Sequence, residues 1–203
     1  MKKNRISKNW INKQKRDIYV RQSQVDGYRA RSAYKLQEID EKFNIFKNGV
    51  SVIDLGASPG SWSQYIFKTV KSGRLVSIDL KDMEAIENTV QIKGDFTDTN
   101  TKNKIKDFFK GKVDVIVSDM AVNTTGIKDI DAIYTGELAI EAMNFSKEML
   151  VKEGRFVSKI FLGSSFNEIV ALGKKIFKEV KVFKPKSSRK ESKESFIICK
   201  ILR

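Results

Sequence analysis

Apolar residues occur in short, nearly continuous runs through the middle of the chain, and these runs alternate with segments of helical periodicity. The runs are rich in Val and Ile, which is typical of strands that helices cover on both faces. Five such runs are VSVIDL (50–55), RLVSIDL (74–80), TVQIKG (89–94), VDVIVSDM (113–120) and RFVSKIF (155–161). The alternation predicts right-handed βαβ connections and a ligand crevice at the carboxyl ends of parallel strands.

Helical patterns fill most of the space between the strand-like runs. The longest of them repeats Leu138, Ala142, Phe145 and Met149 at three- and four-residue spacing. We expect helices at about 31–44, 62–70, 101–110, 135–151 and 166–178, and two closing strands at about 180–184 and 195–202. These elements predict an α/β fold of Rossmann-like type, with a mainly parallel seven-stranded sheet and helices on both faces.

Length and composition narrow the possible chemistry. A chain of 203 residues with 40% hydrophobic residues favours one domain with a substantial core. The chain has no histidine and one cysteine, Cys199, which excludes a Ser-His-Asp triad, a His-ligated metal and an internal disulfide. It also lacks an 18-residue apolar span and a secretory signal pattern. We therefore expect a cytoplasmic protein that has no membrane segment and no metal site.

The net charge of +14 is concentrated at the two ends of the chain. Residues 1–35 carry 11 Lys or Arg against two acids, and residues 174–203 carry 11 against three. The middle of the chain, 36–173, is slightly acidic, with a balance of −3. Basic ends of this kind favour a partner with a phosphate backbone, because each neutralised phosphate releases counterions. A solvated basic surface that serves solubility is the alternative.

Aromatic residues alternate with arginines in the basic N-terminal segment. They are Trp10, Tyr19, Tyr28 and Tyr34. Such rings could stack on the bases of a single-stranded nucleic acid. They could equally pack the N-terminal helices together, and the sequence leaves both interpretations open.

A glycine-containing turn follows the first predicted strand, in the segment DLGASPGSWSQ (54–64). Glycines here allow the backbone to approach a ligand that a Cβ would exclude. The segment has Gly56 and Gly60 but lacks the third glycine of a dinucleotide motif, Pro59 removes an N–H donor, and no Gly-Lys-Ser/Thr follows. The turn suits a phosphate-free ligand such as S-adenosylmethionine, and an ordinary strand-to-helix turn is the alternative.

Two carboxylates lie just beyond the next strand ends. Asp79 ends the second run, where an acid that accepts from ribose hydroxyls is placed in nucleotide-binding halves. Asp95 follows the third run and could accept from an adenine amino group. Each could instead form a turn or a helix N-cap. Asp54, inside the first strand, is expected to order the turn or to face the methionine amine of a ligand.

A chain without histidine needs another side chain as a base, and lysine is the leading candidate. Lys159 interrupts the apolar run 156–161, where burial disfavours its charged form. Lys35 is a candidate for a neighbouring cation, and Asp119 ends the fourth strand beside the same crevice. The alternative for each lysine is that its stem is buried while the ammonium group reaches water.

The chain resembles the FtsJ/RrmJ family of ribosomal RNA large-subunit methyltransferases from about Arg29 to the C-terminus. The segments that carry the resemblance are RSAYKL, DLGASPGSWSQY, SIDL, GDF, SDMA, RFVSKIF and SSRKESKESF. Similarity to this family implies a catalytic tetrad at Lys35, Asp119, Lys159 and Glu194. It also implies S-adenosylmethionine contacts at Gly60, Trp62, Asp79, Asp95 and Asp119. By its local sequence alone, Glu194 would be interpreted as part of a solvated charged turn.

The resemblance further implies the reaction and the substrate. The expected activity is transfer of a methyl group from S-adenosylmethionine to the ribose 2′-hydroxyl of a uridine in large-subunit (23S-type) rRNA, on the assembled 50S subunit. We expect a single methyltransferase domain over 1–203, with 1–30 as a basic RNA-binding extension, in a monomer that binds neither DNA nor membranes. The alternatives are 2′-O-methylation of tRNA, a noncatalytic RNA-binding factor in ribosome assembly, and a nicotinamide-dependent oxidoreductase.

Overall fold

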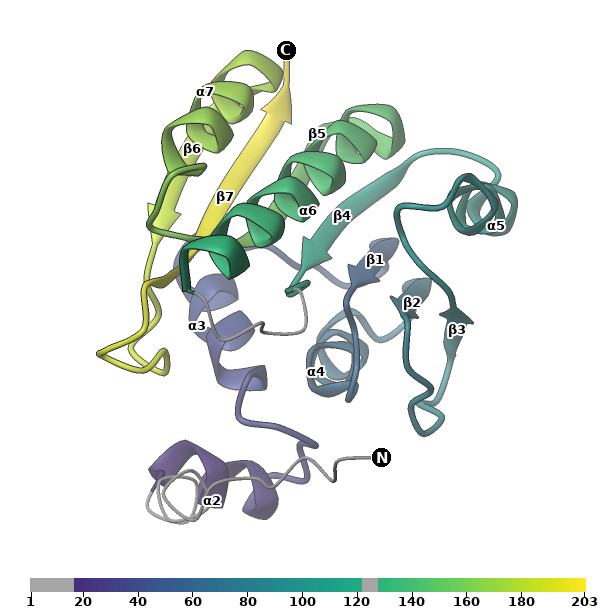
Figure 1. The fold of residues 1–203 in the computed structure, drawn as a ribbon. Coiled ribbons are helices and arrows are strands. Elements are labelled where there is room, and N and C mark those ends of the chain that lie inside the picture. The colour runs from purple at the N-terminus through teal and green to yellow at the C-terminus, as the bar shows by residue number, and fades with distance from the viewer. Residues whose placement is uncertain (1–16, 122–127) are drawn as a thin grey trace, which may run out of the picture.

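The computed structural model of the chain describes residues 17–121 and 128–203. Its centre is a seven-stranded sheet with the order β3-β2-β1-β4-β5-β7-β6 (Figure 1). Strands β1 to β5 pair in parallel, whereas β7 runs antiparallel to both of its neighbours, β5 and β6. The expectation of a mainly parallel seven-stranded α/β sheet is confirmed.

The strands coincide closely with the apolar runs in the sequence. They are β1 (Val52–Leu55), β2 (Leu75–Asp79), β3 (Thr89–Lys93), β4 (Val113–Ser118), β5 (Leu150–Phe161), β6 (Phe177–Phe183) and β7 (Glu194–Leu202). The central strands are buried along most of their length because helices cover both faces, which is why their sequences are continuously apolar.

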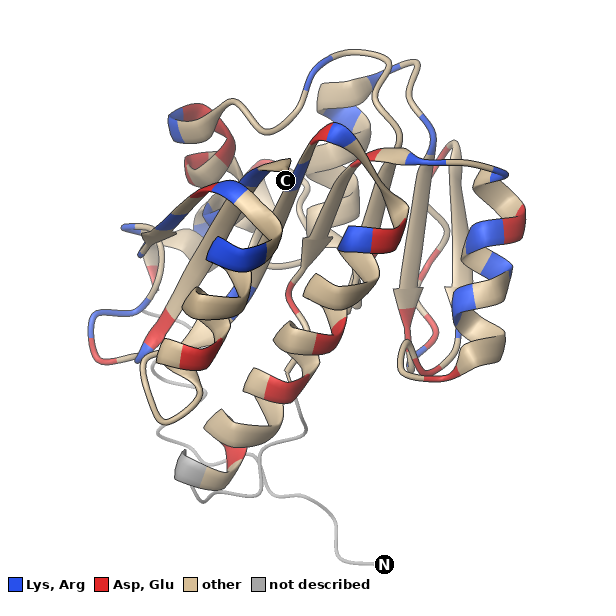
Figure 2. Ribbon diagram, turned by 90° about the horizontal axis from the view of Figure 1, so that it is seen from above, with Lys and Arg blue, Asp and Glu red and all other residues tan. Residues whose placement is uncertain are grey.

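Helices form a layer on each side of the sheet (Figure 2). They are α2 (Ile18–Val25), α3 (Ala33–Phe43), α4 (Ser61–Val70), α5 (Thr99–Phe109), α6 (Lys128–Met149) and α7 (Phe166–Ile176). Leu36 of α3 and Ile66 of α4 belong to one buried cluster. Ile105 of α5, Ala142 of α6 and Ile169 of α7 belong to a second cluster on the opposite face.

The strand order reverses between β1 and β4, since β1 pairs with β2 on one side and with β4 on the other. Ligands of open α/β sheets bind at the carboxyl edge beside such a point. The Asp119 amide donates to the Leu55 carbonyl oxygen at 3.0 Å, which ties the end of β4 to the end of β1 at this position. Helix α2 lies beyond the same edge of the sheet (Figure 1).

Two boundaries differ from the sequence-based prediction. Helix α6 begins at Lys128 instead of about 135, and β5 begins at Leu150, inside the segment expected to be helical. The pairing of β4 with β5 passes from Val113–Leu150 to Val115–Arg155, so an irregularity separates the start of β5 from its regular part. The predicted helix ended too late because Leu150 is apolar and therefore fits the buried face of a helix as well as that of a strand.

Among the described helices, none combines the length and the apolar character that crossing a membrane would require.

Candidate active site

The turn after β1 is shaped by two glycines with positive φ. Gly56 has φ +74°, and a Cβ there would lie 2.7 to 2.9 Å from atoms of Met120, two of them in the backbone. Gly60 has φ +106° and is the N-cap residue of α4; a Cβ there would lie 2.6 Å from Arg29 Nη1. Only glycine satisfies both the backbone conformation and the close approach at Gly56.

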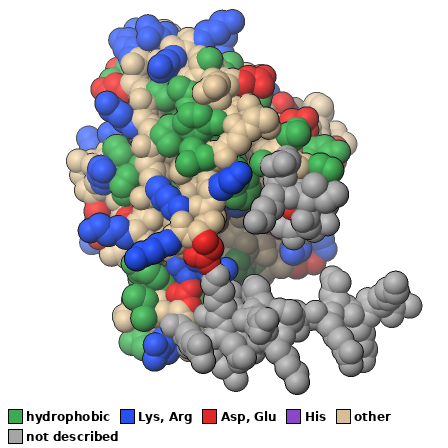
Figure 3. All heavy atoms as spheres, turned by 60° about the vertical axis from the view of Figure 1, so that its left-hand side comes forward, with side chains coloured by type: hydrophobic (Ala, Val, Ile, Leu, Met, Phe, Trp, Pro, Cys, Tyr) green, Lys and Arg blue, Asp and Glu red, His purple; other side chains and the backbone are tan. Residues whose placement is uncertain are grey.

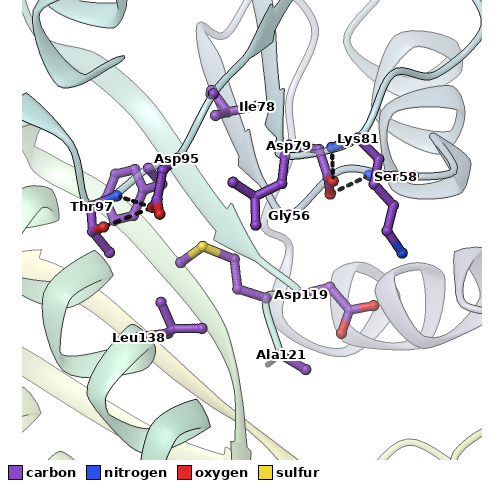
Figure 4. Close-up of a pocket in the computed structure, with 14 residues that line it drawn as sticks. Gly56, Ser58, Ile78, Asp79, Lys81, Asp95, Thr97, Asp119, Ala121 and Leu138 are labelled. Carbon is purple, nitrogen blue, oxygen red and sulfur yellow. Dashed lines mark hydrogen bonds between the residues drawn. The ribbon is translucent and has the colours of Figure 1, made fainter. Parts of the chain in front are cut away.

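A cavity of about 660 Å³ opens beside this turn, at the carboxyl ends of β1, β2, β3 and β4. Ligand pockets commonly have volumes in this range. Three carboxylates, Asp79, Asp95 and Asp119, share its lining with apolar side chains (Figure 4). The remaining lining residues are Gly56, Ser58, Ile78, Leu80, Lys81, Gly94, Phe96, Thr97, Met120, Ala121 and Leu138.

Asp79 and Asp95 each hold local backbone as well as lining the cavity. Asp79 accepts from the amides of Ser58 at 2.9 Å and Lys81 at 2.8 Å. Asp95 Oδ1 accepts from the amide of Thr97 at 2.8 Å and from its hydroxyl at 2.7 Å. Each ionised carboxylate can accept about four hydrogen bonds, so both retain acceptor capacity for a ligand. The turn-forming and ligand-binding roles are therefore compatible.

Asp54 lies under the turn and is fully buried. Its Oδ2 accepts from Ser63 Oγ at 2.6 Å, and Ser63 Oγ also lies 2.7 Å from Ser77 Oγ. Burial raises the pKa of Asp54 to about 7, an effect that the Ser63 hydrogen bond opposes and the carboxylates of Asp119 and Asp79 reinforce. The contact with Ser63, on the first turn of α4, fits the role of ordering the turn.

Lys159 and Asp119 form a largely buried ion pair. The side chain of Lys159 is 9% exposed and that of Asp119 is 19% exposed. Lys159 Nζ lies 3.0 Å from Asp119 Oδ1 and donates to the Asp119 carbonyl oxygen at 2.7 Å. The ammonium group is thereby held at the end of β4, beside the wall of the cavity that Asp119 lines.

Lys35 and Glu194 form a second ion pair. Lys35 Nζ lies 2.7 Å from Glu194 Oε1 and donates to Oε2 at 2.8 Å, so the contact is bidentate. Glu194 Oε1 also accepts from Ser188 Oγ at 2.8 Å. The two side chains are 15% and 12% exposed, so both pairs are mostly shielded from solvent.

The sheet register brings the two pairs to one face. Lys159 on β5 is directly opposite Phe196 on β7, and Phe161 is opposite Glu194. Side chains two residues apart on a strand point to the same face, so Lys159 and Glu194 lie on one side of the sheet. Lys35 Nζ on α3 is 5.9 Å from the centre of the Phe196 ring on that side. Lys35, Lys159 and Glu194 therefore lie on one face of the sheet, and Asp119, just after β4, joins them through its ion pair with Lys159.

Two residues expected to contact a cofactor lie outside the lining of this cavity. Gly60 is buried at the start of α4, and the Trp62 side chain is 2% exposed. Trp62 Nε1 donates to the Ser32 carbonyl oxygen at 2.8 Å, and its ring packs 5.8 Å from that of Phe196. A ligand contact by either residue would come from the backbone, where the first amides of α4 have no partner within the helix. Their cofactor role stays a prediction.

The N-terminal tyrosines pack against one another. The rings of Tyr19 and Tyr28 lie 5.6 and 5.9 Å from that of Tyr34. Tyr34 Oη donates to Asp26 at 2.6 Å. These contacts fix α2 against the start of α3 and favour the packing interpretation for the three tyrosines. Trp10 lies outside the described residues.

Arg29 is a site residue that the sequence did not single out. Its guanidinium group donates to the carbonyl oxygens of Pro59 at 3.1 Å, Glu84 at 2.9 Å and Ala85 at 3.0 Å. It therefore fastens the glycine turn to the loop after β2. The only signal in the sequence was its place in a run of basic residues, where nothing distinguishes it from its neighbours.

Within the described ranges, 17–121 and 128–203, no group of three or more Cys, Asp or Glu residues is arranged to hold a metal ion.

Comparison with known sequences gives consistent matches over the whole chain. Residues 28–202 match the family described as FtsJ-like methyltransferase. The chain is 91% identical to Ribosomal RNA large subunit methyltransferase E of Pelagibacter ubique (strain HTCC1062) over 203 residues, which is 100% of both chains. It is 41% identical to the protein of the same name from Delftia acidovorans, over 97% of this chain and 95% of that one.

Comparison with solved structures agrees. A ribosomal RNA methyltransferase structure from Plasmodium falciparum matches with a TM-score of 0.77 and 33% identity, covering 86% of this chain and 98% of that one. A methyltransferase-fold structure from Streptococcus mutans, in complex with SAH, matches with a TM-score of 0.55 and 13% identity, covering 82% and 97%. At that identity the second match shows the fold alone.

Proposed function

The chain belongs to the FtsJ-like methyltransferase family, and we propose that it methylates the ribose 2′-hydroxyl of a uridine in large-subunit rRNA on the assembled 50S subunit. It is an S-adenosylmethionine-dependent methyltransferase, and its substrate is ribosomal RNA of the large subunit. The particular nucleotide, the assembled subunit and the roles of individual residues are the parts that we propose. The observation that carries the proposal is the Lys159–Asp119 pair at the edge of the carboxylate-lined cavity, with the Lys35–Glu194 pair on the same face of the sheet as Lys159.

The cavity fits S-adenosylmethionine in size and in chemistry. Its carboxylates are acceptors for hydroxyl and amino groups, while Ile78, Phe96 and Leu138 offer apolar surface to a flat ring. We propose that Asp79 accepts from the ribose hydroxyls, Asp95 from the adenine amino group, and Asp119 faces the methionine end. When bound, S-adenosylmethionine supplies an electrophilic methyl group on a positively charged sulfur. Nearby carboxylates stabilise the positive charge on the sulfur. The turn itself must keep glycine at position 56, because a Cβ there would collide with Met120.

The two ion pairs have different roles toward the ribose hydroxyl. Lys159 Nζ is held at the end of β4 by the carbonyl oxygen and the carboxylate Oδ1 of Asp119. There it receives or orients the hydroxyl proton. Glu194 and Lys35 form the neighbouring pair that sets the charge around this lysine. The chemistry depends chiefly on positioning the oxygen for attack.

We also infer that residues 1–203 act as one methyltransferase domain, with the basic segment 1–30 contributing to RNA binding, in a monomer that does not use DNA. In its described part, this segment supplies α2 and Arg29, which contact α3 and the glycine turn. The runner-up functions are methylation of tRNA and a noncatalytic role in ribosome assembly.

The test is to map the methylated nucleotide. The protein is incubated with isotope-labelled S-adenosylmethionine and one of three substrates: purified 50S subunits from cells that lack the enzyme, naked large-subunit rRNA, or tRNA. The proposal predicts label on one uridine 2′-oxygen, fastest with 50S subunits. Label on a base or mainly on tRNA would contradict it, and binding of the cofactor without any transfer would support the noncatalytic alternative. The Lys159→Ala protein, purified in parallel, controls for contaminating methyltransferases.

A further inference from the structure

Two arginines outside the proposed tetrad converge on one carboxylate. Arg31, between α2 and α3, and Arg189, between β6 and β7, both face Asp17 Oδ2. Arg31 forms an ion pair with it, and Arg189 Nε lies 3.8 Å away. The other oxygen of Asp17 accepts from the Tyr19 amide at 3.1 Å, so the same residue is the N-cap of α2.

This cluster borders the reaction centre. A cavity of about 280 Å³ is lined by Arg31, Arg189 and Ser192, together with Lys35 and Glu194 of the proposed tetrad. Two more cations therefore stand next to the place where the target ribose would be held. Lys and Arg side chains are also spread over the β6 side of the molecule, which faces the viewer in Figure 3. An RNA strand that presents a ribose to the tetrad would carry its adjacent phosphates past these arginines.

Arg31 and the loop that carries Arg189 are held by contacts besides those with Asp17. Glu38 on α3 accepts from the amides of Lys186 at 2.6 Å and Ser187 at 2.8 Å, which fastens the β6–β7 loop to the helix. Arg31 in turn donates to the Ser187 carbonyl oxygen. Removal of the Asp17 carboxylate would leave Arg31 and the Arg189 loop anchored, with the guanidinium groups open to another anion.

Asp17 is the N-cap residue of α2, and Tyr19 of the same helix also contacts Arg31, whose Cζ lies 5.2 Å from the centre of the tyrosine ring. The Asp17 side chain is 11% exposed, so its charge is largely removed from water and depends on the arginines for compensation. Burial and the nearby charge of Arg189 lower the pKa of Arg31, and the carboxylates of Glu194 and Glu191 oppose this shift. Arginine pairs with a phosphate diester through the same forked geometry that it uses for a carboxylate.

We propose that Asp17 occupies, in the RNA-free chain, the site that an RNA backbone phosphate takes beside the target ribose. RNA binding then exchanges the carboxylate for a phosphate on Arg31 and Arg189 and releases the start of α2. The Asp17 carboxylate competes with phosphate for these arginines. It partly neutralises Arg31 and Arg189, whose side chains are 15% and 31% exposed, and weakens the binding of nucleic acids that do not reach this site. The inference rests on the proposed RNA substrate. It adds a binding site for one backbone phosphate, which the Asp17 carboxylate fills when RNA is absent.

The test is the affinity for a fluorescently labelled 12-nucleotide single-stranded RNA. Asp17→Asn and Asp17→Ser remove the charge but keep an oxygen that can cap α2. Both are expected to lower the dissociation constant by about three- to tenfold, because the phosphate no longer competes with a carboxylate. Asp107→Asn, an exposed position on α5, changes the net charge equally and is expected to alter affinity by less than about twofold. An equal effect at positions 17 and 107 would overturn the proposal.

A double variant tests the shared site, and hydrogen exchange in the unaltered chain keeps the proposal testable if the position 17 variants fold poorly. In the Arg189→Gln background, the tightening caused by Asp17→Asn is expected to shrink, and a tightening of full size would contradict the shared site. In the unaltered chain, hydrogen exchange at the amides of Tyr19 and Val20 is expected to speed up when the 12-mer binds. Unchanged or slower exchange would also overturn the proposal.

The same experiments separate this inference from the proposed function. The Asp17→Asn effect should appear with a 12-nucleotide DNA as well, since DNA carries the same phosphates and no 2′-hydroxyl. A tightening at position 17 without any ribose methylation would contradict the proposed function alone. Ribose methylation without that tightening would contradict the phosphate exchange alone.

Discussion

Lys159 is held by Asp119 through both the main chain and the side chain: its Nζ donates to the Asp119 carbonyl oxygen at 2.7 Å and lies 3.0 Å from Oδ1. The main-chain contact fixes the direction of the ammonium group, because it persists whatever side chain stands at 119. Oδ1 has no hydrogen bond aligned with it among the described residues. The carboxylate thus contributes charge at the site while the carbonyl contributes position.

The Lys35–Glu194 pair is predicted to act through its charge. Glu194→Gln keeps an oxygen for Ser188 but removes the negative charge beside Lys35. We expect the single-turnover rate of methyl transfer to fall by about ten- to a hundredfold, as for loss of one charged group in a polar catalytic cluster. Glu179→Gln, at an exposed position on β6, is the matched control and should keep its rate.

A double variant tests whether the two residues work as a unit. In the double variant Lys35→Met/Glu194→Gln, the single-turnover rate should fall by less than the product of the two single fold-decreases. The reason is that each single variant leaves a shielded charge without its partner. Multiplicative effects would contradict a functional pair.

Asp95 is predicted to bind the cofactor with the oxygen that Thr97 does not use. Asp95→Asn preserves an acceptor for the Thr97 amide but replaces the second oxygen with an NH₂ group. Titration calorimetry should show S-adenosylmethionine binding weakened by about tenfold, the loss expected for one charge-assisted hydrogen bond. Asp98→Asn is the control, because Asp98 is exposed and makes no side-chain cap bond to α5. Equal affinities in the two variants would remove Asp95 from the site.

Gly56 and Gly27 separate backbone strain from close packing. Both have positive φ, +74° and +71°, but a Cβ at Gly27 would meet nothing within 4 Å, whereas one at Gly56 would meet Met120. Gly27→Ala should cost about 1 kcal/mol of the free energy of unfolding. Gly56→Ala should cost about 2 to 3 kcal/mol more, because the Met120 backbone must move. Urea unfolding measures both, and similar losses would show that the turn accommodates a side chain.

Asp54 is predicted to make the folded chain less stable as pH rises. Its pKa is raised from 3.8 to about 7, so the folded state binds more protons than the unfolded state between about pH 4 and 7. Stability is then full below the unfolded pKa and falls as pH rises through the folded pKa. Urea unfolding should show that, between pH 5 and 8, the free energy of unfolding of the wild-type chain falls by on the order of 1 to 3 kcal/mol relative to that of Asp54→Asn. Asp107→Asn should follow the wild-type curve, and parallel curves for all three would contradict the raised pKa.

The strands and their mainly parallel arrangement were predictable from sequence, because apolar runs that alternate with helical patterns indicate βαβ units, whereas the strand order came from the structure. Strands β1 to β4 lie within a few residues of their predicted ranges, as buried parallel strands tolerate few polar residues. The start of β5 was not predictable, since Leu150 suits a helix and a strand equally.

The site was less accessible to sequence reasoning than the fold. Glu194 lies in a charged segment whose local pattern indicates a solvated turn, yet it is 12% exposed because Lys35 reaches it from 159 residues away. The convergence of Arg31 and Arg189 on Asp17 has no local signal either, since three distant segments supply it. The resemblance to a family implies a tetrad at Lys35, Asp119, Lys159 and Glu194, and the structure supplies the contacts within the pairs Lys35–Glu194 and Lys159–Asp119.

The most direct test of the central claim is the single-turnover rate of methyl transfer by Lys159→Ala beside that of Lys152→Ala. Both lysines stand on β5, but Lys152 is exposed and Lys159 is buried against Asp119. We predict that Lys159→Ala lowers the rate by about 10² to 10⁴, the range for loss of a group that handles a proton, with RNA affinity changed by less than about threefold. Lys152→Ala should keep the wild-type rate. A Lys159→Ala enzyme that transfers methyl groups to the ribose at a near-normal rate would contradict the account.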